Sequence, residues 1–150
     1  MFLGSYNYSM DAKNRVSIPA KFRRYLKPEA LDTFVMTRGL SECVYLYPMD
    51  IWNDQIAPRL GLLDEFDPNE SSFLRLYLEL ASDDSLDTQS RIIIPKTLIE
   101  FAGIEKEVFI LGAMNRIEIW NPETYKKYKE SIQRPYSEIA SEVMKKTKND

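Results

Sequence analysis

The sequence predicts a mixed α/β fold, rich in β-strands, that is built from two tandem repeats. A nine-residue motif, Asp-Ala-Lys-Asn-Arg-Val-Ser-Ile-Pro at 11–19, returns as Asp-Thr-Gln-Ser-Arg-Ile-Ile-Ile-Pro at 87–95, 76 positions later. A second pair of matching segments follows at 35–48 and 108–122, with an offset of 73 positions. Two ordered matches with a small deletion between them indicate a tandem duplication.

The duplication predicts how the chain is divided. We expect a first repeat with its following helices at 1–76, and a second repeat with the C-terminal helix at 77–150. Each half contains too few apolar residues to bury a core of its own, so the two halves are expected to share one.

The first half is predicted to begin with a strand at 2–10 that leads into the motif turn. After the motif, a short helix is expected near 21–26, and two apolar runs at 33–37 and 43–47 are typical of a β-hairpin. Pro48 then begins a helix, because proline suits the first helical position.

A second helix is predicted to begin at Asp67-Pro68-Asn69-Glu70, which offers a capping residue, a proline and a glutamate three positions after the cap. Four apolar residues follow at helical spacing, and we expect this face to pack on the sheet: Phe73, Leu76, Tyr77 and Leu80. Leu74 and Leu78 broaden the stripe, which suggests a contact with a neighbouring subunit.

The second half repeats the plan, with a short helix near 96–101 and a hairpin before Asn121-Pro122. A helix begins at this Asn-Pro pair, and Pro135 interrupts it. We expect one more short helix at 136–144, and an unstructured end from Lys145 onward.

Within each motif, the aspartate and the arginine are predicted to stabilise a turn. Asp11 and Asp87 can accept hydrogen bonds from backbone N–H groups that follow them. Arg15 and Arg91 open the next strand, where each can form a charge-assisted pair with its aspartate. The closing proline of each motif ends the strand and suits the start of a helix.

The repeated pattern Asp-x-x-x-Arg-apolar-x-Ile-Pro resembles that of the MraZ family of bacterial transcriptional regulators, which belongs to the AbrB-like group of swapped-hairpin DNA-binding proteins. The likeness covers nearly the whole chain and extends to Met36-Thr37-Arg38-Gly39-Leu40 and to Asn115-Arg116-Ile117-Glu118-Ile119-Trp120. It implies a swapped-hairpin barrel formed by the two repeats within one chain. The family usually has glycine before each motif arginine, whereas this chain has Asn14 and Ser90.

Charge is segregated along the chain, although the net charge is only −3. Residues 11–27 carry six basic side chains against one acidic side chain, a net charge of +5. Residues 50–87 carry ten acidic against two basic side chains, a net charge of −8, while residues 87–103 are neutral. A local basic patch is what attracts and holds phosphate groups.

The composition argues against an enzyme. The chain has no histidine, which is the commonest acid–base group, and it has no glycine-rich phosphate loop. Cys43 is the only cysteine and lies in an apolar run, so a buried structural thiol is expected. We expect no catalytic residues, no metal, no cofactor, no small-molecule substrate and no membrane segment.

The candidate DNA-binding residues lie mostly in the first motif. Arg15 has the guanidinium geometry that suits guanine, with Lys13 and Asn14 beside it on the turn. Arg23 and Arg24 lie one helical turn after Pro19 and are expected to bind phosphates without reading sequence. Arg91 is the equivalent candidate in the second motif. The alternative is that Asp11–Arg15 and Asp87–Arg91 only stabilise turns, an interpretation that is stronger for the second motif.

The family resemblance implies a sequence-specific regulator that binds double-stranded DNA, most simply a repressor of the division and cell-wall gene cluster. It implies short direct repeats in the promoter, a ring-like homo-oligomer, and a cytoplasmic, nucleoid-associated protein. An antitoxin-like protein-interaction module is the alternative. Antitoxins usually follow one motif with a toxin-binding tail, whereas this chain has a second motif copy.

Overall fold

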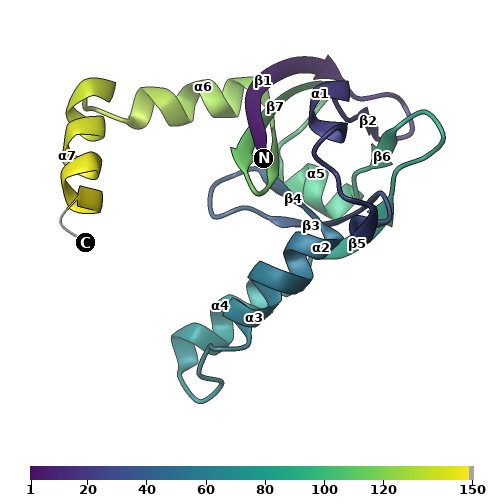
Figure 1. The fold of residues 1–150 in the computed structure, drawn as a ribbon. Helices are drawn as coiled ribbons and strands as arrows, with labels where there is room; N and C mark the ends of the chain where they lie inside the picture. Colours follow the sequence, from purple (N-terminus) through teal and green to yellow (C-terminus); the bar gives the residue numbers. More distant parts are fainter. Residues whose placement is uncertain (149–150) are drawn as a thin grey trace.

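The computed structural model describes residues 1–148. Its strands are β1 (Phe2–Ser9), β2 (Arg15–Ser17), β3 (Thr33–Arg38), β4 (Val44–Pro48), β5 (Ser82–Ser85), β6 (Arg91–Ile93), β7 (Glu107–Met114) and β8 (Ile117–Trp120). Its α-helices are α1 (Ala20–Arg23), α2 (Met49–Ile51), α3 (Ala57–Leu60), α4 (Pro68–Leu78), α5 (Lys96–Ala102), α6 (Pro122–Ser131) and α7 (Tyr136–Lys148) (Figure 1). A 3₁₀ turn, η1 (Pro28–Ala30), and a π-helical turn, η2 (Trp52–Ile56), complete the described elements.

The strands form a six-stranded antiparallel sheet in the order β1-β7-β8-β4-β3-β5, with a separate antiparallel pair of β2 and β6. The outer strand of each half pairs with the other half of the chain. Phe2–Ser9 lies along Glu107–Met114, and Ser82–Ser85 lies along Thr33–Met36. The motif strands also pair across the halves, with Val16 opposite Ile92. This exchange of strands is the swapped-hairpin arrangement.

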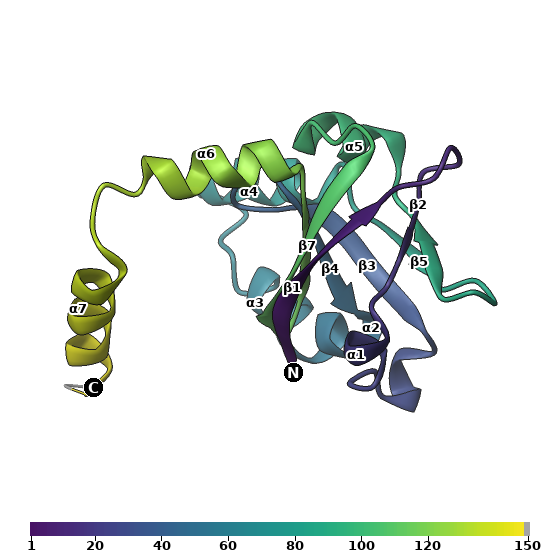
Figure 2. The same ribbon diagram turned by 90° about the horizontal axis from the view of Figure 1, so that it is seen from above.

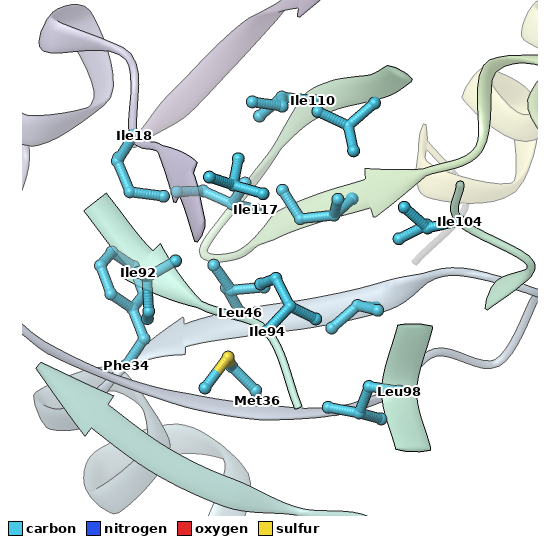
Figure 3. Close-up of a cluster of buried hydrophobic side chains, with 14 of the residues drawn as sticks. Ile18, Phe34, Met36, Leu46, Ile92, Ile94, Leu98, Ile104, Ile110 and Ile117 are labelled. Carbon is cyan, nitrogen blue, oxygen red and sulfur yellow. The ribbon is translucent and has the colours of Figure 1, made fainter. Parts of the chain in front are cut away.

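One hydrophobic core lies between the six-stranded sheet and the β2–β6 pair (Figure 3). The sheet contributes Phe34, Met36, Leu46, Ile110 and Ile117, which are almost fully buried. The motif strands and the segments after them contribute Val16, Ile18, Ile92, Ile94 and Leu98 from the opposite side. The apolar residues of both motifs therefore fasten the two turns to the sheet.

The fold class predicted from the sequence is confirmed: the protein is a mixed, β-rich α/β fold. Among residues 1–148, the hydrogen-bonded sheet ends at β1 and β5 and does not close on itself. The β2–β6 pair packs over the core as a separate two-stranded layer. Over the same residues, the structure contains no helix that is both long and apolar enough to cross a membrane.

A second, smaller aromatic cluster attaches the helices of residues 49–78 to the outer face of the sheet. Trp52 stacks on Tyr77 with ring centroids 6.3 Å apart, and it also lies against Tyr47. Arg116 places its guanidinium 4.3 Å from the centre of the Tyr45 ring and 2.8 Å from the buried carboxylate of Glu118. A cation–aromatic pair and an ion pair together stabilise the outer face of the sheet at its central strands, β8 and β4.

Helix α4 begins as the sequence predicts, because the Asp67 carboxylate accepts hydrogen bonds from the backbone N–H groups of Asn69 and Glu70. The predicted packing face is partly wrong. Tyr77 is buried, but Phe73 is 39% exposed and Leu76 is 51% exposed. Leu80, just after the helix, packs against the core as predicted, so Tyr77 and Leu80 form the inner part of the face and the rest of it points outward.

The C-terminal helices extend from one side of the sheet, with α7 set apart from the body of the molecule (Figures 1 and 2). Helix α6 starts at the predicted Asn-Pro pair, with Asn121 capping the N–H of Glu123. The predicted unstructured end is wrong for residues 145–148, because α7 continues to Lys148. Residues 149–150 of that prediction lie outside the described residues.

Candidate nucleic-acid interface

The first motif turn is held by one aspartate that bonds three donors. The Asp11 carboxylate accepts hydrogen bonds from the backbone N–H groups of Lys13 and Arg15, both at 2.9 Å, and from Nε of Arg15 at 2.7 Å. The Asp11 N–H in turn donates to the Arg15 carbonyl at 3.1 Å. Asp11 therefore ties together the two ends of the turn and orients the arginine side chain.

The second motif turn has the same bonds at equivalent positions. The Asp87 carboxylate accepts from the backbone N–H groups of Gln89 and Arg91 and from Nε of Arg91, each at 2.9 Å. The Asp87 N–H donates to the Arg91 carbonyl at 2.9 Å. The predicted Asp–Arg pairs are confirmed in both motifs.

These bonds lower the pKa of both aspartates from the usual value of 3.8. The backbone N–H of Arg15 is the main stabilising donor for the charged form of Asp11, and the backbone N–H of Arg91 does the same for Asp87. Both carboxylates are therefore ionised at neutral pH, which keeps the arginine side chains in place.

The residue before each motif arginine has a left-handed backbone conformation. Asn14 and Ser90 both have φ of 60°. This region is costly for residues with a Cβ atom, although asparagine adopts it more readily than most. The structure thus shows why glycine suits this position, and it shows that Asn14 and Ser90 both accommodate the turn.

The two turns are joined into one unit. The Ile18 N–H donates to the Ser90 carbonyl at 3.0 Å, and the Ile94 N–H donates to the Asn14 carbonyl at 2.9 Å. Nη1 of Arg91 also lies 3.9 Å from the Asp11 carboxylate. Figure 2 shows both turns projecting at the same end of the molecule, opposite α7. We call residues 11–15 and 87–91 together the turn platform.

Arg23 and Arg24 occupy different places beside the turn platform. Arg23 donates from Nε to the Ile18 carbonyl at 3.2 Å, which holds its side chain against the first motif. Arg24 caps the C-terminal end of α1 and is exposed. The structure therefore brings Arg23 close to the first turn, while Arg24 extends the basic surface beyond it.

A groove of about 480 Å³ separates α1 from the second turn. It is lined in part by Gln89, which the sequence analysis did not include among the candidate DNA-binding residues. Arg23 lines this groove together with Gln89 and Ser90 of the second motif. Gln89 carries no charge and is far from Arg23 in the sequence, and the pairing of β2 with β6 brings the two residues to one groove. Its exposed amide can donate to phosphate or to a base edge.

The tips of the turns differ in charge. Lys13 is exposed in the first turn, and its counterpart in the second turn is the neutral Gln89. Arg23 and Arg24 of the first half correspond to Ile99 and Glu100 of the second. The turn platform is thus symmetric in its backbone and asymmetric in its electrostatics.

Exchanged strands and two joined Asp–Arg turns define the chain as a swapped-hairpin protein of the AbrB-like class. The sequence model of one family, described as "MraZ protein, putative antitoxin-like", matches residues 1–75 and 78–147. The chain therefore belongs to the MraZ family.

Several curated relatives carry the name "Transcriptional regulator MraZ". The protein from Clostridium acetobutylicum is 41% identical over 131 residues, which cover 87% of this chain and 89% of the relative. That from Halothermothrix orenii is 41% identical over 141 residues, covering 94% and 95%. That from Syntrophomonas wolfei is 40% identical over 144 residues, covering 96% and 97%. These names describe a regulator and not an enzyme, as expected from the composition.

Proposed function

We propose that this protein is a transcriptional regulator that binds double-stranded DNA sequence-specifically through the turn platform. The observation that carries the proposal is the joining of two Asp–Arg turns at one end of the molecule, with the basic residues of 11–27 beside them. The names of the MraZ relatives support the same conclusion.

Arg15 is proposed to read bases. Its Nε is committed to Asp11, and this bond fixes the direction of the guanidinium group. Among residues 1–148, no hydrogen bond to either Nη atom of Arg15 is formed, so both remain free to donate to guanine O6 and N7. A structural role and a DNA-binding role are therefore compatible in this side chain, because they use different nitrogen atoms.

The other site residues are proposed to position the protein on DNA. Lys13 and Asn14 accompany Arg15 on the first turn, and Arg91 presents the equivalent group from the second. Arg23 and Arg24 supply contacts to phosphates, which fix register and orientation without carrying sequence information. The net charge of +5 over residues 11–27 favours the first turn as the principal contact.

We further propose that the two halves, 1–76 and 77–150, act as one unit within a ring-like homo-oligomer. A single turn platform offers few phosphate contacts, whereas linked subunits can raise affinity by about 10²–10⁴ through effective concentration. Direct repeats in the promoter of the division and cell-wall gene cluster would suit such an array. We also propose that the protein represses that cluster and associates with the nucleoid in the cytoplasm.

A second candidate function is an antitoxin-like module that binds another protein. It is favoured by the exposed helix α7 and by the description of the matching family. This alternative does not explain the turn platform, because the free cationic groups of the platform indicate an anionic ligand.

Footprinting on the DNA upstream of the protein's own gene tests the proposed function. We expect protection of short direct repeats that persists in the presence of excess unrelated duplex of equal length. Protection that the unrelated duplex removes completely would contradict sequence-specific binding. The same assay with the repeats scrambled distinguishes recognition of the repeats from attraction to DNA in general.

A further inference from the structure

An aromatic hollow of about 270 Å³ lies on the outer face of the sheet, between strand β4 and helices α3 and α4. Its floor consists of Tyr45, Tyr47 and Tyr77, each of which is at most 7% exposed. The Tyr45 and Tyr47 rings pack edge to face with centroids 6.0 Å apart, and Phe73 stacks on Tyr77 at 5.3 Å. These contacts hold the rings in place, so the hollow is already formed in the single chain.

Two arginines supply the charge of this aromatic hollow. Arg116 uses the Nε and Nη2 edge of its guanidinium for the Glu118 carboxylate, at 2.9 and 2.8 Å, so this pair is neutral as a whole. Arg59 on α3 is exposed, and among residues 1–148 it forms no ion pair. None of the described residues that line the hollow is acidic. The lining therefore carries one positive charge that is not neutralised, which favours an anion.

The rim of the aromatic hollow is apolar and uncovered. Leu40 in the loop before β4 is 76% exposed, and Phe73 is 39% exposed. Covering such side chains is favourable, and a flat aromatic group can pack on the tyrosines below them. Pockets for drug-sized ligands usually measure about 300 Å³ or more, so this hollow suits a smaller molecule with an aromatic body.

The surroundings limit the charge that such a ligand can carry. Residues 49–79 contain seven acidic side chains against Arg59 and Arg75, a net charge of −5. This field repels nucleotides, nucleic acids and other ligands with several negative charges. A single carboxylate at the rim can pair with Arg59 while the rest of the ligand stays uncharged.

We propose that the aromatic hollow binds a small amphipathic monoanion, with an aromatic body on the tyrosines and one carboxylate paired with Arg59. The tyrosine hydroxyl groups can donate further hydrogen bonds to the ligand. Tyr45 and Tyr47 alternate along β4 with Leu46, which lies in the core beneath the motif strands. The hollow is thus a second site, on the other face of the sheet from the motif strands, and the proposal does not rest on DNA binding.

Two matched probes test the proposal on the full-length protein. Naphthalene-2-carboxylate has the proposed body and charge, and naphthalene-2-carboxamide has the same shape without the charge. Ligand-observed NMR titrations at neutral pH measure the affinity of both. We expect saturable binding of both probes and an affinity about two- to fivefold higher for the carboxylate, which is the usual effect of one exposed ion pair.

Arg59→Gln should abolish the preference for the carboxylate and leave the affinity for the carboxamide unchanged. Arg75→Gln removes the same charge from α4, outside the hollow, and should leave the preference intact. Leu40→Glu places a negative charge at the rim and should reverse the preference. Leu62→Glu is its control, because Leu62 is 85% exposed and does not line the hollow. All four side chains are exposed, so circular dichroism should show an unchanged fold.

The absence of saturable binding of naphthalene-2-carboxylate to the unmodified protein would overturn the proposal, and so would equal affinity for the two probes. Equal effects of Arg59→Gln and Arg75→Gln would show a general effect of charge and would also overturn it. Each titration contains no DNA. A failure here therefore leaves the proposed DNA binding intact, and a failure of the footprinting experiment leaves this site intact.

Discussion

The two motif turns share a backbone and differ in charge. Each has an aspartate bonded to two backbone N–H groups and to an arginine Nε, and each has a residue at φ of 60° before the arginine. The exposed positions carry a net charge of +5 around the first turn and none around the second. The residues that build the turn do not determine the charge around it. Two turns with the same backbone can therefore contribute unequally to DNA binding.

The largest expected difference is between Arg15→Ala and Arg91→Ala. Arg15 stands in the basic half of the platform, so its loss should weaken operator binding by roughly 1–3 kcal/mol per site, or about 5- to 150-fold, and relax sequence preference. Arg91→Ala should weaken binding less, because its surroundings are neutral. Fluorescence anisotropy with operator and scrambled duplexes measures both effects.

Both variants also lose an Asp–Arg pair, so each needs a structural control. Circular dichroism and thermal unfolding should show similar, small losses of stability, because the two pairs have matching bonds. Equal losses of operator affinity in two stably folded variants would show that local charge does not distinguish the turns.

Arg23→Ala and Arg24→Ala should weaken binding to all DNA sequences alike. If each side chain contacts one phosphate, its removal should reduce the slope of log affinity against log salt by about 0.9. Glu100→Ala in the second half, at the exposed position equivalent to Arg24, is the control and should leave the slope unchanged. A change in sequence preference at constant slope would instead make these arginines base-reading residues.

The two turns should also differ, by a smaller amount, in how glycine at the left-handed position changes the stability of the protein. Ser90→Gly should remove the cost of a left-handed conformation, which is about 1–2 kcal/mol. Glycine also has more conformational entropy in the unfolded chain, and this opposes the gain. We therefore expect the free energy of unfolding to rise by up to about 1 kcal/mol. Asn14→Gly should change the free energy of unfolding by less, because asparagine tolerates this conformation. Urea unfolding measures both, and a loss of stability in Ser90→Gly would contradict the assigned strain.

Acid should affect the two turns alike. A carboxylate whose pKa is lowered in the folded state contributes stability that is present above its usual value of 3.8 and is lost as the pH falls through the lowered value. Asp11→Asn and Asp87→Asn should each make unfolding less sensitive to pH below about pH 4. Urea midpoints at pH 7 and pH 3 test this, and a variant with unchanged pH sensitivity would contradict the assigned hydrogen bonds.

Local patterns predicted much of the fold. The repeat located both turns, the Asp–Arg pairs followed from residue chemistry, and the Asp67 cap placed the start of α4 correctly. Short-range signals are enough for these features because each depends on residues that are four or fewer positions apart. The mixed, β-rich fold class followed from the same patterns.

Long-range pairings did not follow from local patterns, and only the family resemblance implied an exchange of strands. Nothing local specified that β1 would pair with β7, and the position of Gln89 beside Arg23 depends on the pairing of β2 with β6. The outward side of α4 was misassigned because its apolar residues surround more than half of the helix, and only tertiary packing selects Tyr77 as the buried one. Helix α7 runs past the predicted end because Lys145 and Lys146 are good helix formers.

Site-directed DNA cleavage tests most directly whether the turn platform faces DNA, with the first turn as the principal contact. Cys43 is the only cysteine, and it is fully buried with a raised pKa, so a thiol-reactive iron chelate should spare it. Ala12→Cys and Thr88→Cys place the chelate on the two turn tips, and Glu130→Cys on α6 is the control. We predict strong operator cleavage from residue 12, weaker cleavage from residue 88 and none from residue 130. Cleavage from residue 130 that equals or exceeds cleavage from residue 12 would contradict the proposed interface.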